Sequence, residues 1–192
     1  AEEKRALSHK KSIDRIKTRI TLLDNQEKEI IQEITQIVKL DDTVSKLVLL
    51  LCSLPGVAIL TAATILGETS GFNLIRNKRQ ITSYAGLDVQ EKQSGTSVKG
   101  KPRISKKGNK NLRKAMYLPA LAAIRKDERF KALFVRLVGK HGVKKKAAVA
   151  VQRKLLEMTY TIYKTRKPYD ENYLSTALHQ NIPADIKIGN SH

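Results

Sequence analysis

Apolar residues recur every three or four positions along the first 40 residues, on a background of charged and polar side chains. The two sets that share a heptad position are Ile13, Ile20 and Ile34, and Ile16, Leu23, Ile30 and Ile37. This spacing is typical of a coiled-coil seam, which Glu27 interrupts. We therefore predict a dimerising coiled coil over residues 1–40. The alternative is one long helix that lies on a globular part.

A denser apolar pattern begins after residue 40, and Asp41 and Asp42 offer caps for a new helix there. Two apolar helices, joined by a turn at residues 54–58, are predicted over residues 43–68. The turn resembles a helix-hairpin-helix element, in which a glycine, here Gly56, brings backbone N–H groups close to a DNA phosphate. Ala58 stands where that motif usually has a second glycine. A plain helical hairpin is the alternative.

The rest of the chain predicts further helices around one irregular segment. Asn77 is a candidate cap for a short helix, and residues 86–108 have the Gly, Ser and Thr content of a loop or irregular hairpin. Helix is predicted to resume at residues 109–165, with a kink or break at Pro119 and a cap at Asp127. The predicted fold class is mainly α. The predicted domains are residues 1–40, residues 41–169 and a tail at residues 170–192.

Charge narrows the choice of partner. The 192 residues contain 37 Lys and Arg against 18 Asp and Glu, a formal net charge of +19. A polyanion is therefore the expected partner. Pro55 and Gly56 interrupt the longest apolar run, so we expect no membrane span and no signal peptide. One cysteine and four scattered histidines predict no internal disulfide, no zinc site and a reducing, cytoplasmic location.

The cations are densest between residues 99 and 114, where no acid separates them. Eight like charges repel one another unless a polyanion binds, which predicts phosphate binding. The alternative is a mobile loop whose charges are hydrated. The eight are Lys99, Lys101, Arg103, Lys106, Lys107, Lys110, Arg113 and Lys114.

A second basic cluster stands at the predicted start of the last helix. Lys144, Lys145 and Lys146 oppose the helix dipole there, so an anion beside them would stabilise the helix. We therefore add these three lysines to the candidate nucleic-acid-binding residues.

Four motifs in order carry a family resemblance. They are "LPGVAILTAATIL", "SYAGLDVQEKQSG", "ISKKGNKNLRKAMYLPAL" and "GKHGVKKKAAVAVQRKLLEMTYTIY". Over residues 51–169 the chain resembles the C-terminal transposase domain of the insertion sequence 110/116/902 transposases. The resemblance implies a DNA recombinase with a catalytic serine, and a guide RNA in at least some relatives. We expect a bacterial, nucleoid-associated protein, and the heptads of residues 13–37 predict a homodimer or higher oligomer.

In such relatives, an N-terminal RuvC-like domain binds divalent metal, expected to be Mg²⁺, through four carboxylates, and a coiled coil follows it. The acids of this chain form no recognisable series of that kind. We therefore expect a fragment that lacks the nuclease-like domain, holds no cofactor of its own and is inactive alone.

The family serine matches Ser94, which precedes Gly95 and follows the Gly86-Leu87 pair. A serine hydroxyl is a weak nucleophile until a base or metal activates it, and cations stabilise the charge that develops on an attacked phosphodiester. The family motif makes Arg103, Lys106 and Arg113 phosphate-binding candidates, with transition-state stabilisation assigned to Arg103 or Arg113.

Other hydroxyls and other functions compete with this assignment. Ser97 and Ser105 are rival hydroxyls, although Ser105 is better explained as a capping or structural residue. Asp88-Val89 replaces the Thr-Pro that often follows Gly-Leu in the family. The leading hypothesis is the strand-exchange domain of a transposase. The alternatives are a non-catalytic nucleic-acid-binding module and a structural coiled-coil protein whose charge is incidental.

Overall fold

The chain is mainly helical, as predicted, in a computed structural model. The structure describes residues 2–90, 93–94, 98–99 and 103–170, and for residues 2–8, 93–94 and 98–99 it describes the backbone. Two compact units, Ala1–Leu49 and Leu50–His192, divide the chain and are treated separately below. Among the described helices, none combines the length and the apolar character that a membrane crossing requires.

The first unit contains helix α1 (Glu2–Leu40) and most of α2 (Asp42–Cys52). The break between them falls at Asp41, whose Oδ1 accepts hydrogen bonds from the backbone N–H groups of Thr43, at 2.8 Å, and Val44, at 3.1 Å. These bonds satisfy donors that the first turn of a helix leaves without partners. The predicted cap is confirmed.

The heptad residues lie on one continuous helix and are exposed in the single chain. Ile16 is 59% exposed and Ile37 is 66% exposed. One helix of 39 residues is compatible with a coiled-coil strand. The coiled coil itself stays a prediction.

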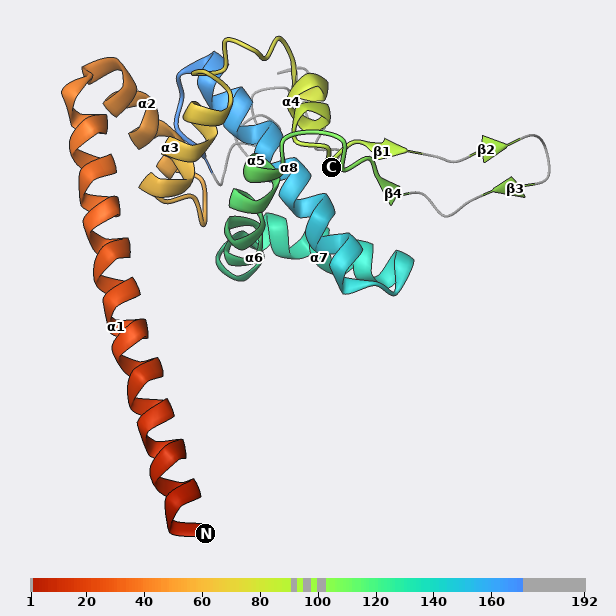
Figure 1. The fold of residues 1–192 in the computed structure, drawn as a ribbon. Coiled ribbons are helices and arrows are strands. Elements are labelled where there is room, and N and C mark those ends of the chain that lie inside the picture. Colours follow the sequence, from red (N-terminus) through yellow and green to blue (C-terminus); the bar gives the residue numbers. More distant parts are fainter. Residues whose placement is uncertain (1, 91–92, 95–97, 100–102, 171–192) are drawn as a thin grey trace, which may run out of the picture. The chain divides into compact units, whose positions relative to one another are not determined.

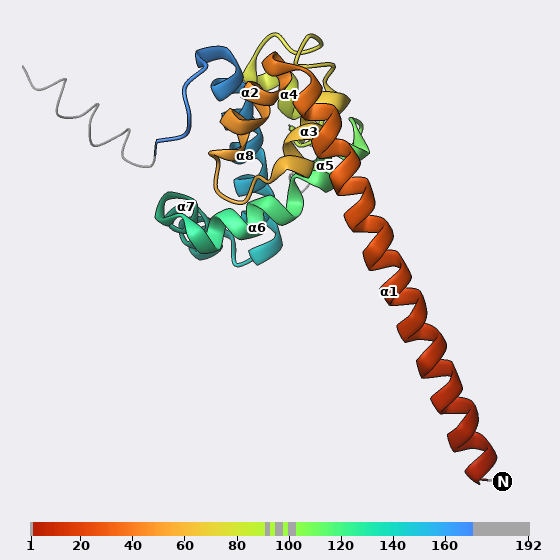
Figure 2. The ribbon, with the colours of Figure 1, turned by 90° about the vertical axis from the view of Figure 1, so that its left-hand side faces the viewer.

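The second unit is built from short helices around one long one (Figure 1). Helix α8 packs against α4, α6 and α7, and Figures 1 and 2 both show it running through the unit. The helices are α3 (Ile59–Glu68), α4 (Lys78–Tyr84), α5 (Lys110–Ala115), α6 (Tyr117–Lys126), α7 (Glu128–His141) and α8 (Lys144–Thr165).

Small residues let neighbouring helices approach α8 closely. Ala147, Ala148 and Val151 are buried near its start, and Leu155 and Leu156 are fully buried at its middle. Burial of each large aliphatic side chain contributes roughly 1.5–3 kcal/mol before entropic costs. The core of the second unit therefore lies along α8.

Polar caps fix the starts of three of these helices. Asn77 accepts a hydrogen bond from the N–H of Gln80, and Asn109 accepts one from the N–H of Leu112. Asp127 accepts two at the start of α7. The caps at Asn77 and Asp127 were predicted, because each is a bond between residues two or three positions apart. For Asn109 the sequence predicted only that helix resumes there.

The predicted break near Pro119 is also present. Helix α5 ends at Ala115, and α6 begins at Tyr117. Pro119 lies in the first turn of α6, where a missing backbone N–H costs little. The interruption turns the chain between two helices that both contact the core.

The predicted irregular hairpin is present between α4 and α5. Strand β1 (Val89–Gln90) pairs antiparallel with β4 (Arg103–Ile104), and β2 (Gln93–Ser94) pairs antiparallel with β3 (Val98–Lys99). In Figure 1, β1 and β4 leave the helices together, with β2 and β3 beyond them. We call these four strands together the hairpin arm.

Candidate nucleic-acid interface

The hairpin arm is fastened to the helices by a paired serine and aspartate. The backbone N–H of Ser105 donates to the carbonyl of Asp88 at 2.9 Å, and the Ser105 hydroxyl donates to Asp88 Oδ1. The backbone bond extends the β1–β4 pairing by one residue on each strand, and the side-chain bond reinforces it. Ser105 is therefore structural in this conformation, as the sequence suggested.

Two glycines let two backbone segments approach each other closely at the base of the hairpin arm. Gly86 has a φ of +65°, and its carbonyl accepts a hydrogen bond from the N–H of Lys106 at 3.0 Å. A Cβ on Gly108 would lie 2.1 Å from the carbonyl oxygen of Tyr84 and 2.4 Å from the nitrogen of Gly86. No side chain fits there. The Gly-Leu and Lys-Gly-Asn motifs therefore make one tight structure, the glycine crossing.

Arg113 reinforces the glycine crossing from α5. Its Nη1 donates to the carbonyl of Ala85 at 2.7 Å, and its guanidinium is half-buried. Its own carbonyl accepts a hydrogen bond from Gln152 Nε2 of α8 at 2.5 Å. An arginine side chain has five N–H donors, so the bond from Nη1 to Ala85 leaves others for a ligand. The phosphate-binding role of Arg113 stays a prediction, beside a structural role that the sequence did not indicate.

The other described cations of this stretch have exposed side chains. They lie in β4, in the turn that follows it and in α5, and no ion pair involves them among the described residues. Exposed, uncompensated cations at one end of a hairpin are suited to phosphate contacts. They are Arg103, Lys106, Lys107, Lys110 and Lys114.

The candidate nucleophile lies farther along the arm. Ser94 stands in β2 opposite Val98 of β3, and Lys99 stands opposite Gln93; the structure describes the backbone of these four residues. The rival Ser97 and the candidate cation Lys101 lie outside the described residues. The assignment of Ser94 stays a prediction.

Glu68 is a part of this region that sequence reasoning missed. Its carboxylate accepts hydrogen bonds from Asn109 Nδ2 at 2.6 Å and Asn111 Nδ2 at 2.9 Å, and its carbonyl accepts one from the Tyr84 hydroxyl at 2.8 Å. The amide of Asn109, and then that of Asn111, lowers the pKa of the Glu68 carboxyl. Glu68 thus links α3 to both sides of the glycine crossing.

Gly56 has a packing role in this structure. It has a φ of +83°, and a Cβ there would lie 2.5 Å from the carbonyl oxygen of Pro119 and 2.9 Å from the Cβ of Ala122. The absence of a side chain lets the turn after α2 contact α6 directly. The helix-hairpin-helix detail is not confirmed.

The lysine cluster lies where the sequence placed it. Lys144, Lys145 and Lys146 are exposed in the first turn of α8. Val143, the capping residue, has no side-chain hydrogen bond to that turn. The cluster is separate in sequence from the hairpin arm, and its phosphate-binding role stays a prediction.

In the described part of the chain, no three His, Cys, Asp or Glu side chains come together in a group that could hold a metal ion. The acids described above have other contacts: Asp88 accepts from Ser105, and Glu68 accepts from two asparagines.

A basic hairpin fastened to a helical core defines a domain class suited to contacting a polyanion. Residues 48–135 match the model of the "Transposase IS116/IS110/IS902 family". The match confirms the resemblance that the four sequence motifs carry.

Curated relatives agree with the family match. The pilin gene-inverting protein of Moraxella bovis is 28% identical over 153 residues, which cover 79% of this chain and 45% of the relative. That of Moraxella lacunata is 29% identical over 156 residues, with the same coverage. An IS110 insertion element protein of Streptomyces coelicolor is 29% identical over 124 residues, or 62% of this chain and 30% of the relative. The chain thus spans less than half the length of each of these relatives.

Proposed function

We propose that this chain is the DNA-binding and strand-exchange part of a recombinase that moves or inverts a DNA segment. The family match and the names of the Moraxella relatives support DNA as the substrate. The observation that carries the proposal is the hairpin arm, whose strand β2 contains Ser94 and whose last strand leads into a run of exposed cations.

In the proposed reaction, Ser94 Oγ attacks the phosphorus of a phosphodiester. A bond forms between Oγ and phosphorus, and the bond from phosphorus to one deoxyribose oxygen breaks. That oxygen leaves as a hydroxyl after taking a proton, and a base accepts the serine proton. A second DNA hydroxyl then attacks the phosphoserine and restores the serine, so the number of phosphodiester bonds is conserved.

The cations at the base of the arm hold the DNA backbone in this proposal. Arg103 is exposed in β4, and its planar guanidinium suits two oxygens of one phosphate. Lys106, Lys107, Lys110 and Lys114 supply charge that releases counterions from DNA. Arg113 keeps the glycine crossing in shape through Ala85 and offers its remaining donors to phosphate.

Pairing, metal, a guide RNA and the activity of the isolated chain are further features of the proposed function. Pairing of α1 with a second copy brings two domains to two DNA ends. Divalent metal, expected to be Mg²⁺, belongs to a separate carboxylate-bearing domain, and no step above is routed through it. A guide RNA is a further proposed partner, which the family resemblance implies. We expect the 192-residue chain alone to bind DNA without recombining it.

A serine substitution tests the proposal in protein expressed from its complete gene. In Ser94→Ala, DNA affinity should stay within about twofold, and recombination should fall at least about 10³-fold, because no phosphoserine link forms. Ser97→Ala, three residues away, is the matched control and should recombine normally. Unchanged recombination in Ser94→Ala would instead favour a non-catalytic nucleic-acid-binding module.

A further inference from the structure

One face of α7 carries a second arrangement of cations, away from the hairpin arm. Arg129, Ala132, Leu133 and Arg136 line an open depression of about 260 Å³. Their spacing of three, four and seven residues places all four on one side of the helix. Arg136 is exposed and Arg129 is half-buried, with the apolar Leu133 between them.

The segment that follows α8 holds Arg129 in place. Arg129 Nη1 donates to the carbonyl of Asp170 at 2.9 Å, and its guanidinium carbon lies 5.7 Å from the centre of the Tyr169 ring. Tyr169 is itself anchored, because its N–H donates to Ser53 Oγ at 2.7 Å and its hydroxyl donates to Asp127 Oδ2 at 2.5 Å. Burial, and then the bond to Asp127, raise the pKa of Tyr169, so the hydroxyl keeps its proton at neutral pH.

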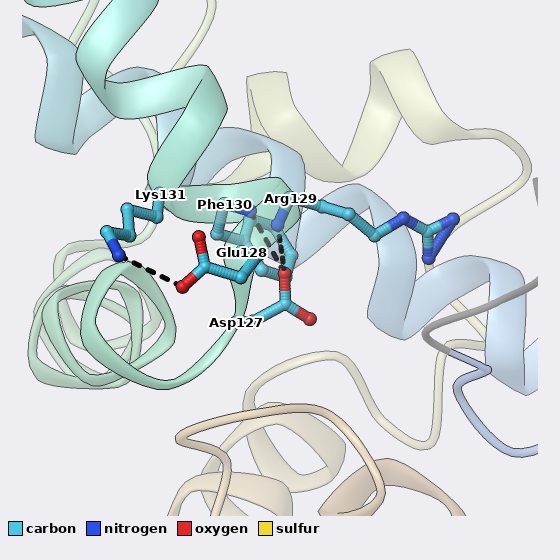
Figure 3. Close-up of polar contacts among 5 residues, drawn as sticks. All are labelled: Asp127, Glu128, Arg129, Phe130 and Lys131. Atoms are coloured by element: carbon cyan, nitrogen blue, oxygen red, sulfur yellow. Dashed lines mark hydrogen bonds and ion pairs between the residues drawn. The ribbon is translucent and has the colours of Figure 1, made fainter.

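The two acids at the start of α7 bind other groups. Asp127 is 3% exposed, and its Oδ1 accepts from the backbone N–H groups of Arg129, at 2.9 Å, and Phe130, at 3.0 Å. Glu128 pairs with Lys131 at 2.9 Å. Figure 3 shows the Arg129 side chain extending away from that pair. Within the described part of the chain, no ion pair or hydrogen bond involves the Arg136 side chain.

The surrounding sequence strengthens the positive field at this face. Residues 129–146 contain seven Lys and Arg and no Asp or Glu. A solvated helix face usually mixes both signs of charge. Here the only acids at the start of α7 are bound by its N-terminal turn, by Tyr169 or by Lys131.

We propose that Arg129 and Arg136 bind two phosphates on one strand of duplex DNA, with Leu133 and Ala132 against the sugars between them. Seven helical residues span about 10 Å, and three nucleotides of one strand rise about 10 Å along a duplex. Each arginine can therefore meet its own phosphate. The site rests on the proposed function, because that function supplies DNA as the partner, and it extends the contact surface beyond the hairpin arm.

Salt dependence of binding to a duplex of about 30 base pairs tests the site. In Arg136→Gln, the slope of log K against log salt should become shallower by about 0.9, because one phosphate contact is lost. In the double variant Arg129→Gln/Arg136→Gln, the change should be about 1.8. Arg136 has no partner to lose within the described part of the chain, so its variant should fold normally, as circular dichroism would verify.

Arg79→Gln is the matched control, because Arg79 is an exposed arginine on α4, outside this face. It removes the same charge and should leave the slope nearly unchanged. An equal loss in the control, or an unchanged slope in Arg136→Gln, would overturn the site while leaving the proposed function intact. A loss confined to single-stranded RNA of the same length would also overturn it. Failure of the unsubstituted protein to bind DNA would overturn the proposed function itself.

Discussion

At Gly108, one hydrogen atom in place of a methyl group decides whether the base of the hairpin arm can form. A Cβ there would overlap the backbone of Tyr84 and Gly86. The end of a flexible side chain could change rotamer to make room for the methyl group, but these backbone atoms cannot. The glycine crossing therefore depends on this residue more strictly than on any of the cations around it.

Gly108→Ala should lower the free energy of unfolding by roughly 2 kcal/mol or more, because the added methyl group forces backbone apart. Gly139 provides the matched control: it lies within α7, and a Cβ there meets nothing within 4 Å. Gly139→Ala should raise the same free energy by about 0.5–1 kcal/mol. Urea unfolding measures both. Equal effects of the two changes would refute the proposed tightness of the glycine crossing.

Sequence reasoning at the residue scale succeeded where the interaction is local. Asn77 and Asp127 were predicted as caps, and each accepts a hydrogen bond from a backbone N–H two or three residues ahead. It could not find the contact of Glu68 with Asn109, which are 41 residues apart, because only the fold brings them together. Charge and the family motif assigned Arg113 to phosphate and did not reveal its bond to Ala85.

At the scale of elements, the periodicity of apolar residues predicted the helices well. The break before α6 followed from one proline, and the irregular hairpin followed from its Gly, Ser and Thr content. Gly56 shows where the same reasoning stopped. A glycine in a turn between two helices is compatible with both a phosphate site and a packing contact. The close approach of Gly56 to the carbonyl of Pro119 indicates the packing contact.

The seam of α1 carries a prediction at this scale. Ile30 is 55% exposed in the single chain, and a partner helix would bury it. We expect sedimentation equilibrium to find a dimer whose dissociation constant rises at least about 100-fold in Ile30→Asp, because a buried unpaired charge is costly.

Gln32→Asp is the control for this measurement. It adds the same charge two residues away, at an exposed position outside the heptad seam. It should leave the dimer within about threefold of its original dissociation constant. A monomeric chain at every concentration, or equal weakening by the two substitutions, would exclude the seam as the dimer contact.

At the scale of the whole molecule, the net charge of +19 is distributed over more than one surface. The exposed cations near the hairpin arm, the lysines of α8 and the arginines of α7 all belong to the second unit. A domain that held DNA at several of these surfaces would keep a strand in place while its phosphodiester is cut and rejoined. That requirement links the proposed binding surfaces to the proposed chemistry.

The central claim is that Ser94 becomes covalently linked to DNA. It is tested most directly by trapping the protein, expressed from its complete gene, on a nicked DNA substrate that prevents rejoining. Mass spectrometry of the digested adduct then locates the linkage. We predict a phosphodiester at Ser94 that is absent in Ser94→Ala. A linkage at Ser97 or Ser105, or efficient strand exchange with no protein–DNA adduct, would contradict it.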